Sequence, residues 1–256
     1  MIVLLKVWQW RYKVYALLFC IFVLTSAPAS LLTLLVKSAA PNLLLGEAHG
    51  SFWQGEVAQA AVKINGGSLY LGKLQWSIQP LSLLLLSPRV SIKTETAGQT
   101  LMATAKAYPN GSVNLSDVRG EVPVSIIEPW VPVLISGQVF FDFDYIAIKE
   151  NTIKKLQGAI NLRDIIWRGG DVPMPLGNYQ AELSSNAEAI TVNISDQNAR
   201  LGLEGLVNAM FSGEYQMELT ASAREGLNPA VIKSVAWLGK KRGEGVVVIG
   251  RRGEWK

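Results

Sequence analysis

The chain has 256 residues, of which 49% are hydrophobic and only 17% are charged, so it can bury a core and is too apolar to be intrinsically disordered. Its net charge of +4 does not indicate a nucleic-acid partner, because the basic residues gather toward the two ends. Between them, residues 14–223 hold 13 basic and 17 acidic residues, which leaves no basic face on the main part of the chain.

The first element predicted is a transmembrane helix. Residues 14–36 form a run of 23 residues without a charge, and about 20 suffice to span a bilayer. Three basic residues precede the run, which predicts a cytoplasmic tail at 1–13 and places the remainder outside. Aromatic and basic side chains that favour the membrane interface precede the run, and we expect them to anchor it: Trp8, Trp10, Arg11, Tyr12 and Lys13.

A cleaved signal peptide is the alternative for this segment. The basic start, the apolar run 14–24 and the triplet Ala27-Pro28-Ala29 would all suit one. Against it, the apolar run resumes after Ser30, so we favour the uncleaved anchor.

Beyond residue 46 the dominant period is two, which is typical of half-buried strands. Val139, Phe141, Phe143 and Tyr145 are predicted to share one face of a strand, and 190–194 and 215–221 alternate in the same way. Residues 69–78 alternate too, but the phase slips at Gly72-Lys73, which predicts a β-bulge there.

Turn signals separate these strands. They are Asn65-Gly66-Gly67, Pro109-Asn110-Gly111, Gly169-Gly170-Asp171 and Pro173-Met174-Pro175. Asn110-Gly111 predicts a tight hairpin. Short turns without long intervening helices predict an all-β fold with an antiparallel sheet, either a sandwich or an open curved sheet.

Residues 122–136 are expected to connect two β units, one at 46–121 and one at 137–256. Pro123, Pro129 and Pro132 argue against both a central strand and a regular helix in this stretch. Trp53-Gln54-Gly55 in the first unit has a weak counterpart in Trp167-Arg168-Gly169 of the second.

One short C-terminal helix is predicted at 228–239, with Asn228 as its N-cap and Pro229 at its first position. Its apolar stripe would consist of Val231, Ile232, Val235 and Leu238.

No pattern of catalytic residues stands out, so we do not expect an enzyme or a cofactor. His49 is the only histidine and Cys20 the only cysteine, and no HExxH, CxxC, Walker or GxGxxG motif is present. Asp142 and Asp144 could form a carboxylate pair, but a solvated strand face is the simpler interpretation. For the tryptophans at 53, 76 and 167 we expect core packing, with an apolar groove or partner site as the alternative.

In combination these features resemble the type II secretion system protein N family. The motif residues are Gly50, Trp53, Gly55, Leu71, Gly72 and Trp76 in the first half, and Trp167, Pro175, Leu176, Gly177 and Tyr179 in the second. Leu156-Gln157-Gly158 and Trp237-Leu238-Gly239 add to the match, whereas Ser51-Phe52 departs from the family's usual threonine and aliphatic residue.

The resemblance implies a single-pass subunit of the cell inner membrane with a periplasmic β domain. Its partners would be other subunits of the type II protein secretion machinery, namely the inner-membrane platform and the outer-membrane channel, together with membrane lipid. The family carries no catalytic or metal residues to transfer. The β domain also resembles AsmA-like envelope proteins, which suggests an alternative role in handling lipids or other apolar ligands.

Overall fold

The computed structural model describes residues 15, 22, 26–64, 67–127, 134–150, 152–170 and 172–254. The predicted interface anchors Trp8, Trp10, Arg11, Tyr12 and Lys13 lie outside these residues, as do residues 14, 16–21 and 23–25 of the predicted span 14–36. No helix within the described ranges combines the length and the apolar character needed to cross a membrane.

The first half of the described chain contains two short helices among β-strands. Its elements are α2 (Ala29–Ala39), β1 (Leu43–Leu45), β2 (Ala48–Gly50), β3 (Gln54–Ile64), β4 (Gly67–Ile78), α3 (Pro80–Leu84), β5 (Arg89–Thr96), β6 (Gln99–Ala107), β7 (Val113–Pro123) and the 3-10 turn η1 (Val124–Ile127).

The second half contains one helix. Its elements are β8 (Ile135–Lys149), β9 (Thr152–Trp167), β10 (Met174–Ser185), β11 (Ala189–Asp196), β12 (Leu201–Met210), β13 (Glu214–Ala223), α4 (Pro229–Ala236), β14 (Lys240–Gly243) and β15 (Val246–Glu254).

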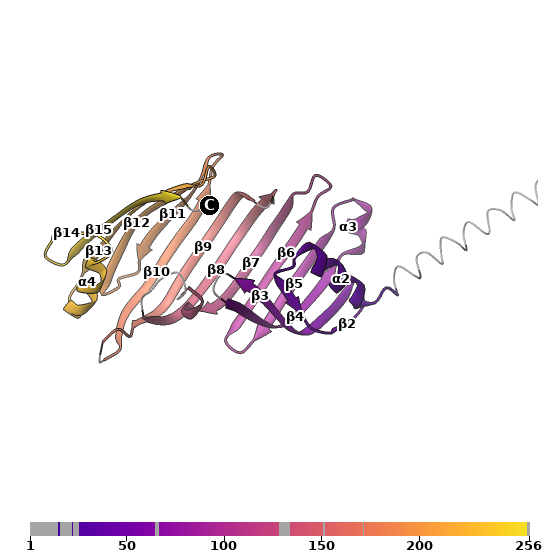
Figure 1. The fold of residues 1–256 in the computed structure, drawn as a ribbon, viewed down its shortest axis with the longest axis horizontal. Helices are drawn as coiled ribbons and strands as arrows, with labels where there is room; N and C mark the ends of the chain where they lie inside the picture. The colour runs from indigo at the N-terminus through magenta and orange to yellow at the C-terminus, as the bar shows by residue number, and fades with distance from the viewer. Residues whose placement is uncertain are drawn as a thin grey trace, which may run out of the picture.

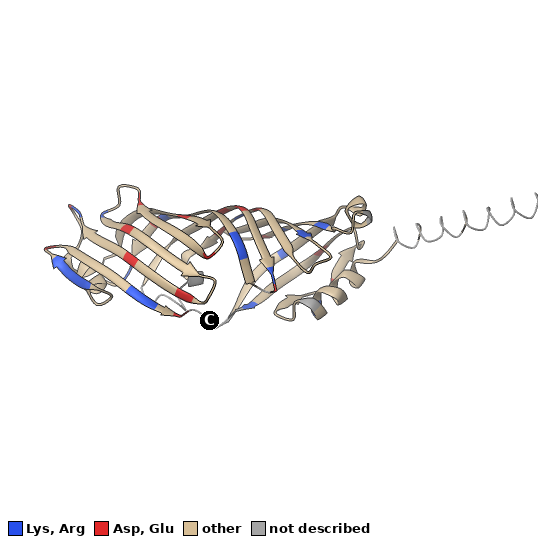
Figure 2. Cartoon of the chain, turned by 90° about the horizontal axis from the view of Figure 1, so that it is seen from above, with Lys and Arg blue, Asp and Glu red and all other residues tan. Residues whose placement is uncertain are grey.

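All of these strands belong to a single open sheet of antiparallel pairs, 15-stranded within the described residues (Figure 1). Neighbours in the chain are neighbours in the sheet from β3 to β13. At the C-terminal edge β15 lies between β13 and β14, and at the N-terminal edge both β1 and β2 pair with β3. The view from above shows that the sheet is twisted and not flat (Figure 2). The all-β antiparallel prediction is therefore confirmed, in the form of an open sheet.

The bulge predicted at Gly72 is present. The β3–β4 ladder shifts register between Ala60 and Ala61, opposite Gly72 and Tyr70. Gly72 has φ +72°, and a Cβ there would lie 2.6 Å from the backbone oxygen of Glu95. Only glycine fits this combination of a left-handed backbone and a close neighbouring strand.

The hairpin predicted at Asn110-Gly111 joins β6 to β7. The N–H of Gly111 donates to the carbonyl of Tyr108 at 3.0 Å, and Gly111 has φ +77°. This is the tight turn that the sequence indicates.

The predicted alternation of side chains between the two faces of the sheet holds from Val139 to Phe143 and fails at Tyr145. Phe143 pairs with Gly158 of β9, but Tyr145 pairs with Gln157. Adjacent partners in β9 point to opposite faces, so Tyr145 faces away from Phe143. The prediction that it shares the face of Phe141 and Phe143 is wrong, because a bulge at Asp144 interrupts the period of two.

The connector predicted at 122–136 is shorter than expected. Val122 and Pro123 continue β7 and pair with β8, which begins at Ile135. The prediction that Pro123 excludes a central strand is consistent with this arrangement, because β6 pairs with β7 only as far as Glu121. Pro123 thus has a strand on one side only, and its missing N–H costs no ladder bond.

Helix α4 follows the sequence prediction closely. The side chain of Asn228 caps it by accepting a hydrogen bond from the N–H of Ala230 at 2.9 Å, and Pro229 is the first helical residue. Of its predicted stripe, Val231 is buried, and Ile232 and Val235 pack against the sheet, while Leu238 is exposed.

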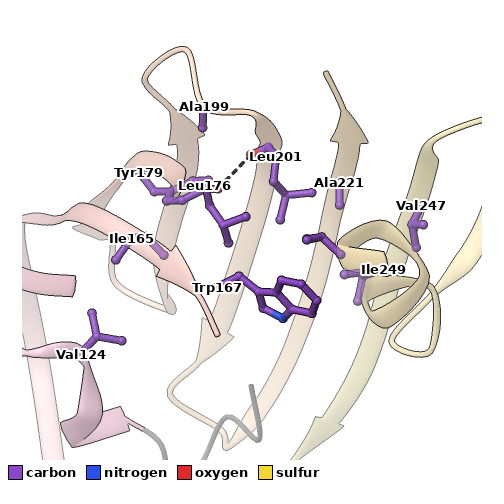
Figure 3. Packing of buried hydrophobic residues seen from close by; sticks show 11 residues of the cluster. Val124, Ile165, Trp167, Leu176, Tyr179, Ala199, Leu201, Ala221, Val247 and Ile249 are labelled. Carbon is purple, nitrogen blue, oxygen red and sulfur yellow. Dashed lines mark hydrogen bonds between the residues drawn. The ribbon is translucent and has the colours of Figure 1, made fainter. Parts of the chain in front are cut away.

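The buried side chains form two clusters. The first lies in the N-terminal half: Ala29, Val57, Ala60, Leu71, Trp76 and Ile78. The second lies in the C-terminal half (Figure 3): Val124, Ile165, Trp167, Leu176, Tyr179, Ala199, Leu201, Ala221, Val231, Val247 and Ile249. One continuous sheet carries both clusters, and its division into units at 46–121 and 137–256 stays a prediction.

Candidate interaction surfaces

The sheet has one apolar and one polar face, and the strand register separates them. One row of paired residues crosses twelve strands, from β3 to β13 and then β15. It consists of Val57, Leu74, Thr94, Leu101, Gly120, Phe141, Ile160, Ala181, Ile194, Gly205, Leu219 and Ile249. Paired residues point to the same side, so these define one face, here called the inner face.

The next row crosses the same strands on the opposite side, the outer face. It consists of Glu56, Gln75, Lys93, Met102, Arg119, Asp142, Ala159, Glu182, Asn193, Leu206, Glu218 and Gly250. Most of its members are charged or polar, whereas Thr94 is the single polar member of the inner row. The outer face is therefore suited to solvent and the inner face to burial.

Within the described residues, α-helices cover the two ends of the inner face, and no α-helix covers its middle. Helix α2 packs against β1, β2 and β3, and α4 packs against β13 and β15 (Figure 1). Val57 and Ile249 at the two ends of the row are buried at 0% and 6% exposure. Phe141, Ile160 and Ile194 between them are only partly buried. A contiguous, partly exposed apolar strip of this kind is a candidate surface for binding.

The motif residues of the first half build the first cluster. A Cβ on Gly55 would lie 2.4 Å from Cζ2 of Trp76, so the indole ring lies directly on this glycine. Trp76 is 6% exposed, and its indole N–H donates to the carbonyl of Phe52 at 3.1 Å. Gly50 has φ +95°, and Trp53 packs edge-on against Phe52 with ring centroids 5.3 Å apart. Together with Leu71 and Gly72, these residues form the packing in and around the first cluster.

The motif residues of the second half belong to the second cluster. Trp167 and Leu176 are both 5% exposed. Gly177 has φ +126°, and a Cβ there would lie 2.6 Å from Cβ of Ala199. Pro175 lies in the same strand, β10, and pairs with Ile166 of β9. The burial of Trp76 and Trp167 agrees with the core packing expected from the sequence.

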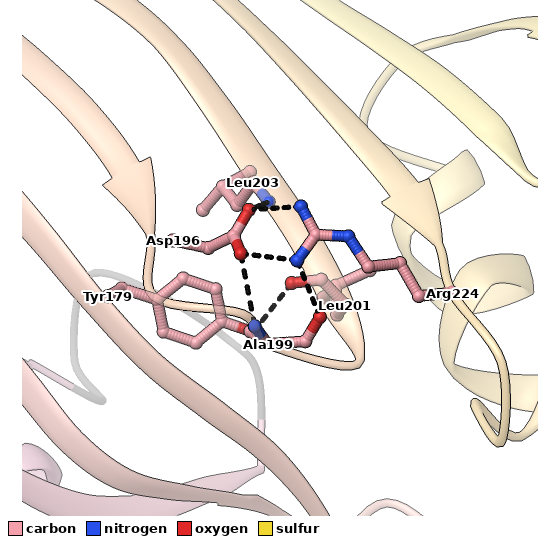
Figure 4. Close-up of polar contacts among 6 residues, drawn as sticks. All are labelled: Tyr179, Asp196, Ala199, Leu201, Leu203 and Arg224. Atoms are coloured by element: carbon pink, nitrogen blue, oxygen red, sulfur yellow. Dashed lines mark hydrogen bonds and ion pairs between the residues drawn. The ribbon is translucent and has the colours of Figure 1, made fainter.

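A polar network connects the loops of the second half (Figure 4). The two terminal guanidinium nitrogens of Arg224, Nη1 and Nη2, donate to the carboxylate of Asp196, at 2.5 and 3.0 Å, and the Asp196 side chain is 1% exposed. Asp196 also accepts the backbone N–H groups of Ala199 and Leu203. Burial opposes its ionisation, but these hydrogen bonds outweigh burial and lower the pKa of the Asp196 carboxyl.

Tyr179 completes this network from β10. Its hydroxyl donates to the carbonyl of Leu201 at 3.0 Å. Burial, with the nearby charge of Asp196 as a smaller cause, raises the pKa of this hydroxyl, so it remains protonated and serves as a fixed donor. The last motif residue thus ties β10 to β12 across the intervening β11.

An apolar groove lies between α4 and the inner face and encloses about 720 Å³. Trp167, Leu176, Leu201, Leu219 and Ile249 of the sheet line one side, and Val231, Val235 and Trp237 of the α4 region line the other. Arg251 is the charged group among its described lining residues. Trp237 is 90% exposed. We call this the C-terminal groove.

A second hollow of about 840 Å³ lies on the outer face of the first half. His49, Glu56, Lys93 and Arg119 are among its lining residues. Glu56 is paired with Lys73 at 2.8 Å, which lowers the pKa of its carboxyl. The Glu56–Lys73 pair is well exposed, so we attribute little stability to it.

The carboxylates of this face do not assemble into a metal site. Asp142 is half exposed and forms an ion pair with Arg119 at 3.0 Å, and Asp144 lies in the bulge beside it. Across the described part of the chain, no group of three or more His, Cys, Asp or Glu residues is arranged to hold an ion.

Sequence reasoning missed the Asp196–Arg224 pair and the C-terminal groove. The pair joins residues 28 positions apart, and neither residue belongs to a recognised motif. For the groove, one signal in the sequence is Trp237, which enters the family resemblance only as part of Trp237-Leu238-Gly239.

The fold and its surfaces define a single-sheet β domain with one polar face and one apolar, partly uncovered face. The family model of type II secretion system protein N matches residues 41–250, and the chain therefore belongs to this family. It is an accessory subunit of the type II secretion system. No curated protein and no solved structure matched the chain.

Proposed function

We propose that this subunit sits in the inner membrane and uses its β domain, on the periplasmic side, as a structural docking module for other secretion subunits. The observation that carries the proposal is that the described residues leave the middle of the inner face partly exposed, in a chain that belongs to the protein N family over residues 41–250. The role is one of assembly and not of catalysis, and it needs no cofactor.

The docking surface proposed is the strip of the inner face between α2 and α4. Phe141, Ile160 and Ile194 lie on it with their neighbours in the inner row. These side chains are partly exposed, so a partner that covered them would remove apolar area from water. Interfaces that persist in assemblies are more apolar than ordinary surface, and this strip has that character.

The membrane location rests on the uncharged run 14–36 and on the basic residues before it. In this arrangement the N-terminus is cytoplasmic and the sheet is periplasmic.

The test is site-specific photo-crosslinking in cells that secrete through this system. A photoreactive residue at Ile160 samples the inner face, and one at Ala159 samples the outer face of the same strand. The expected result is capture of secretion subunits from position 160 and not from 159, together with loss of secretion on deletion of the gene. Equal capture from both positions, or secretion that is unaffected by the deletion, would contradict the proposal.

The C-terminal groove favours a second candidate function, the binding of an anionic amphiphile. Its lining is apolar, and Arg251 could pair with an anionic headgroup while the groove holds an alkyl chain. Mass spectrometry of the purified chain should then detect bound lipid, and Val235→Trp, which fills the groove, should abolish it. An exposed site on the outer face, Asn193→Trp, is the matched control.

A further inference from the structure

Helix α2 is apolar on both sides, but the domain covers only one of them. Ala29 and Thr33 face the first cluster at 1% and 8% exposure. Leu31, Leu34 and Leu35 project from the other side at 46%, 64% and 59% exposure. Three large apolar side chains exposed together on one side of a helix make an apolar environment against that side favourable.

A second group of exposed leucines lies in α3 and the turn that follows it. Leu81, Leu85 and Leu86 are 75%, 78% and 71% exposed. The turn that presents them is well ordered by hydrogen bonds. The Ser82 hydroxyl donates to the carbonyl of Gln79 at 2.5 Å and accepts the N–H of Arg89 at 2.8 Å.

The backbone of this turn also holds a leucine in an unfavourable conformation. Leu86 has φ +50°, a region in which residues other than glycine are uncommon. Its N–H donates to the carbonyl of Leu83 at 2.9 Å. Exposed leucines in an ordered and locally strained turn indicate a function for their exposure.

Both leucine groups lie at the same end of the long axis of the molecule. Figure 1 places α2 and α3 at the end occupied by the first strands, opposite the end that carries α4 and β14. The two segments that carry the leucines, residues 26–46 and 79–94, contain no acidic residue, and the first acids beyond them are Glu47 and Glu95. Lys37 and Arg89 are exposed within these segments. Exposed apolar side chains with cations on the same segments are typical of a surface that lies against an anionic bilayer.

The continuity of the chain points to the same environment. Leu31, Leu34 and Leu35 are part of the uncharged run 14–36 and also part of α2. The helix that packs on the sheet therefore lies where that run ends.

We propose that Leu31, Leu34, Leu35, Leu81, Leu85 and Leu86, the leucine patch, insert into the headgroup region of an anionic membrane and hold this end of the sheet against it. The proposal rests on the proposed membrane location of the subunit. It assigns the end of the run 14–36 that forms α2, together with α3 and the turn after it, to an interfacial bilayer contact, and it leaves the part of the run before α2 to the span. This contact would orient the sheet with its α2 end at the membrane and its α4 end away from the membrane.

The test measures the depth of a fluorophore in the full chain, reconstituted in vesicles of phosphatidylethanolamine and phosphatidylglycerol that contain nitroxide-labelled lipid. Leu85→Cys in a Cys20→Ser background carries the fluorophore in the patch. Val172→Cys in the same background is the control, because Val172 is also 75% exposed but lies between β9 and β10. The native Cys20, labelled in the unaltered chain, reports on the run 14–36 separately.

The expected result is quenching of the Leu85 label about twofold or more above that of the Val172 label, and greater with shallow than with deep nitroxides, since interfacial side chains lie about 5–10 Å deep. An unquenched Leu85 label with a quenched Cys20 label would overturn the patch proposal while leaving the span, and would point to a protein partner on the leucines. Quenching at Leu85 without quenching at Cys20 would support the patch and contradict the span. Equal quenching at Leu85 and Val172 would show unspecific adhesion and overturn the patch.

Discussion

The substitution Gly55→Ala tests whether the motif position must lack a side chain so that the indole ring of Trp76 can pack on it. An added Cβ would lie 2.4 Å from Cζ2 of Trp76 and 2.7 Å from the backbone oxygen of His49. Carbon atoms in good contact are about 3.5–4.0 Å apart, so the ring would have to move by about 1 Å or more. The ring is 6% exposed and is held by its hydrogen bond to Phe52, so it has little room to move.

Overpacking of this kind costs about 1–3 kcal/mol, and the two contacts together place Gly55→Ala in the upper half of that range. For a domain of this size each kcal/mol shifts the Tm by about 2–4 °C, so we expect a fall of roughly 4–10 °C. The measurement is thermal unfolding of the full chain in detergent, followed by circular dichroism.

A matched control and a double mutant identify the cause. At Gly250 a Cβ would meet nothing within 4 Å, so Gly250→Ala in β15 should leave the Tm nearly unchanged. In a Trp76→Leu background the cost of Gly55→Ala should fall by about 1 kcal/mol, because the residues are in direct contact. An unchanged Tm for Gly55→Ala, or an equal cost in both backgrounds, would refute the reasoning.

Three further substitutions probe the second half. Tyr179→Phe removes the hydrogen bond to Leu201 and should lower the free energy of unfolding by about 1 kcal/mol, measured by thermal unfolding; an unchanged value would mean that the bond contributes nothing. Asn228→Ala removes the cap of α4 and should also cost about 1 kcal/mol, with a rise in proteolysis of the C-terminal region as a second readout. Arg224→Met should lower the Tm more at about pH 7 than at about pH 3. Because the folded pKa of Asp196 is lowered, the stability that the pair contributes is present above the unfolded pKa and is lost as the pH falls through the folded pKa. A loss of Tm that is independent of pH would contradict this role.

Local signals in the sequence were enough to predict the strands, several turns and α4. Gly72 and Gly111 require positive φ, and such positions attract glycine whatever the rest of the fold does. Asn228 and Pro229 act on the first turn of their own helix. These features depend on neighbours in the chain, which a sequence displays directly.

The features that the sequence did not predict depend on strand register. Tyr145 changes face because β9 advances by one residue where β8 advances by two, and no residue in 139–145 signals that slip. Pro123 fits in a strand because β6 ends before reaching it. The Asp196–Arg224 pair and the C-terminal groove likewise arise where β10 to β15 come together, and they follow from the assembled sheet alone.

The order of the strands also bears on how the protein acquires its structure. From β3 to β12 each strand pairs with the strand before it and the strand after it in the chain. A polypeptide that emerges N-terminus first can therefore add one strand at a time to a growing edge, without waiting for distant segments. Synthesis and folding can proceed in the same direction, and a chain interrupted between two hairpins should retain the structure already laid down, as in repeat proteins whose stability is a sum of nearest-neighbour terms.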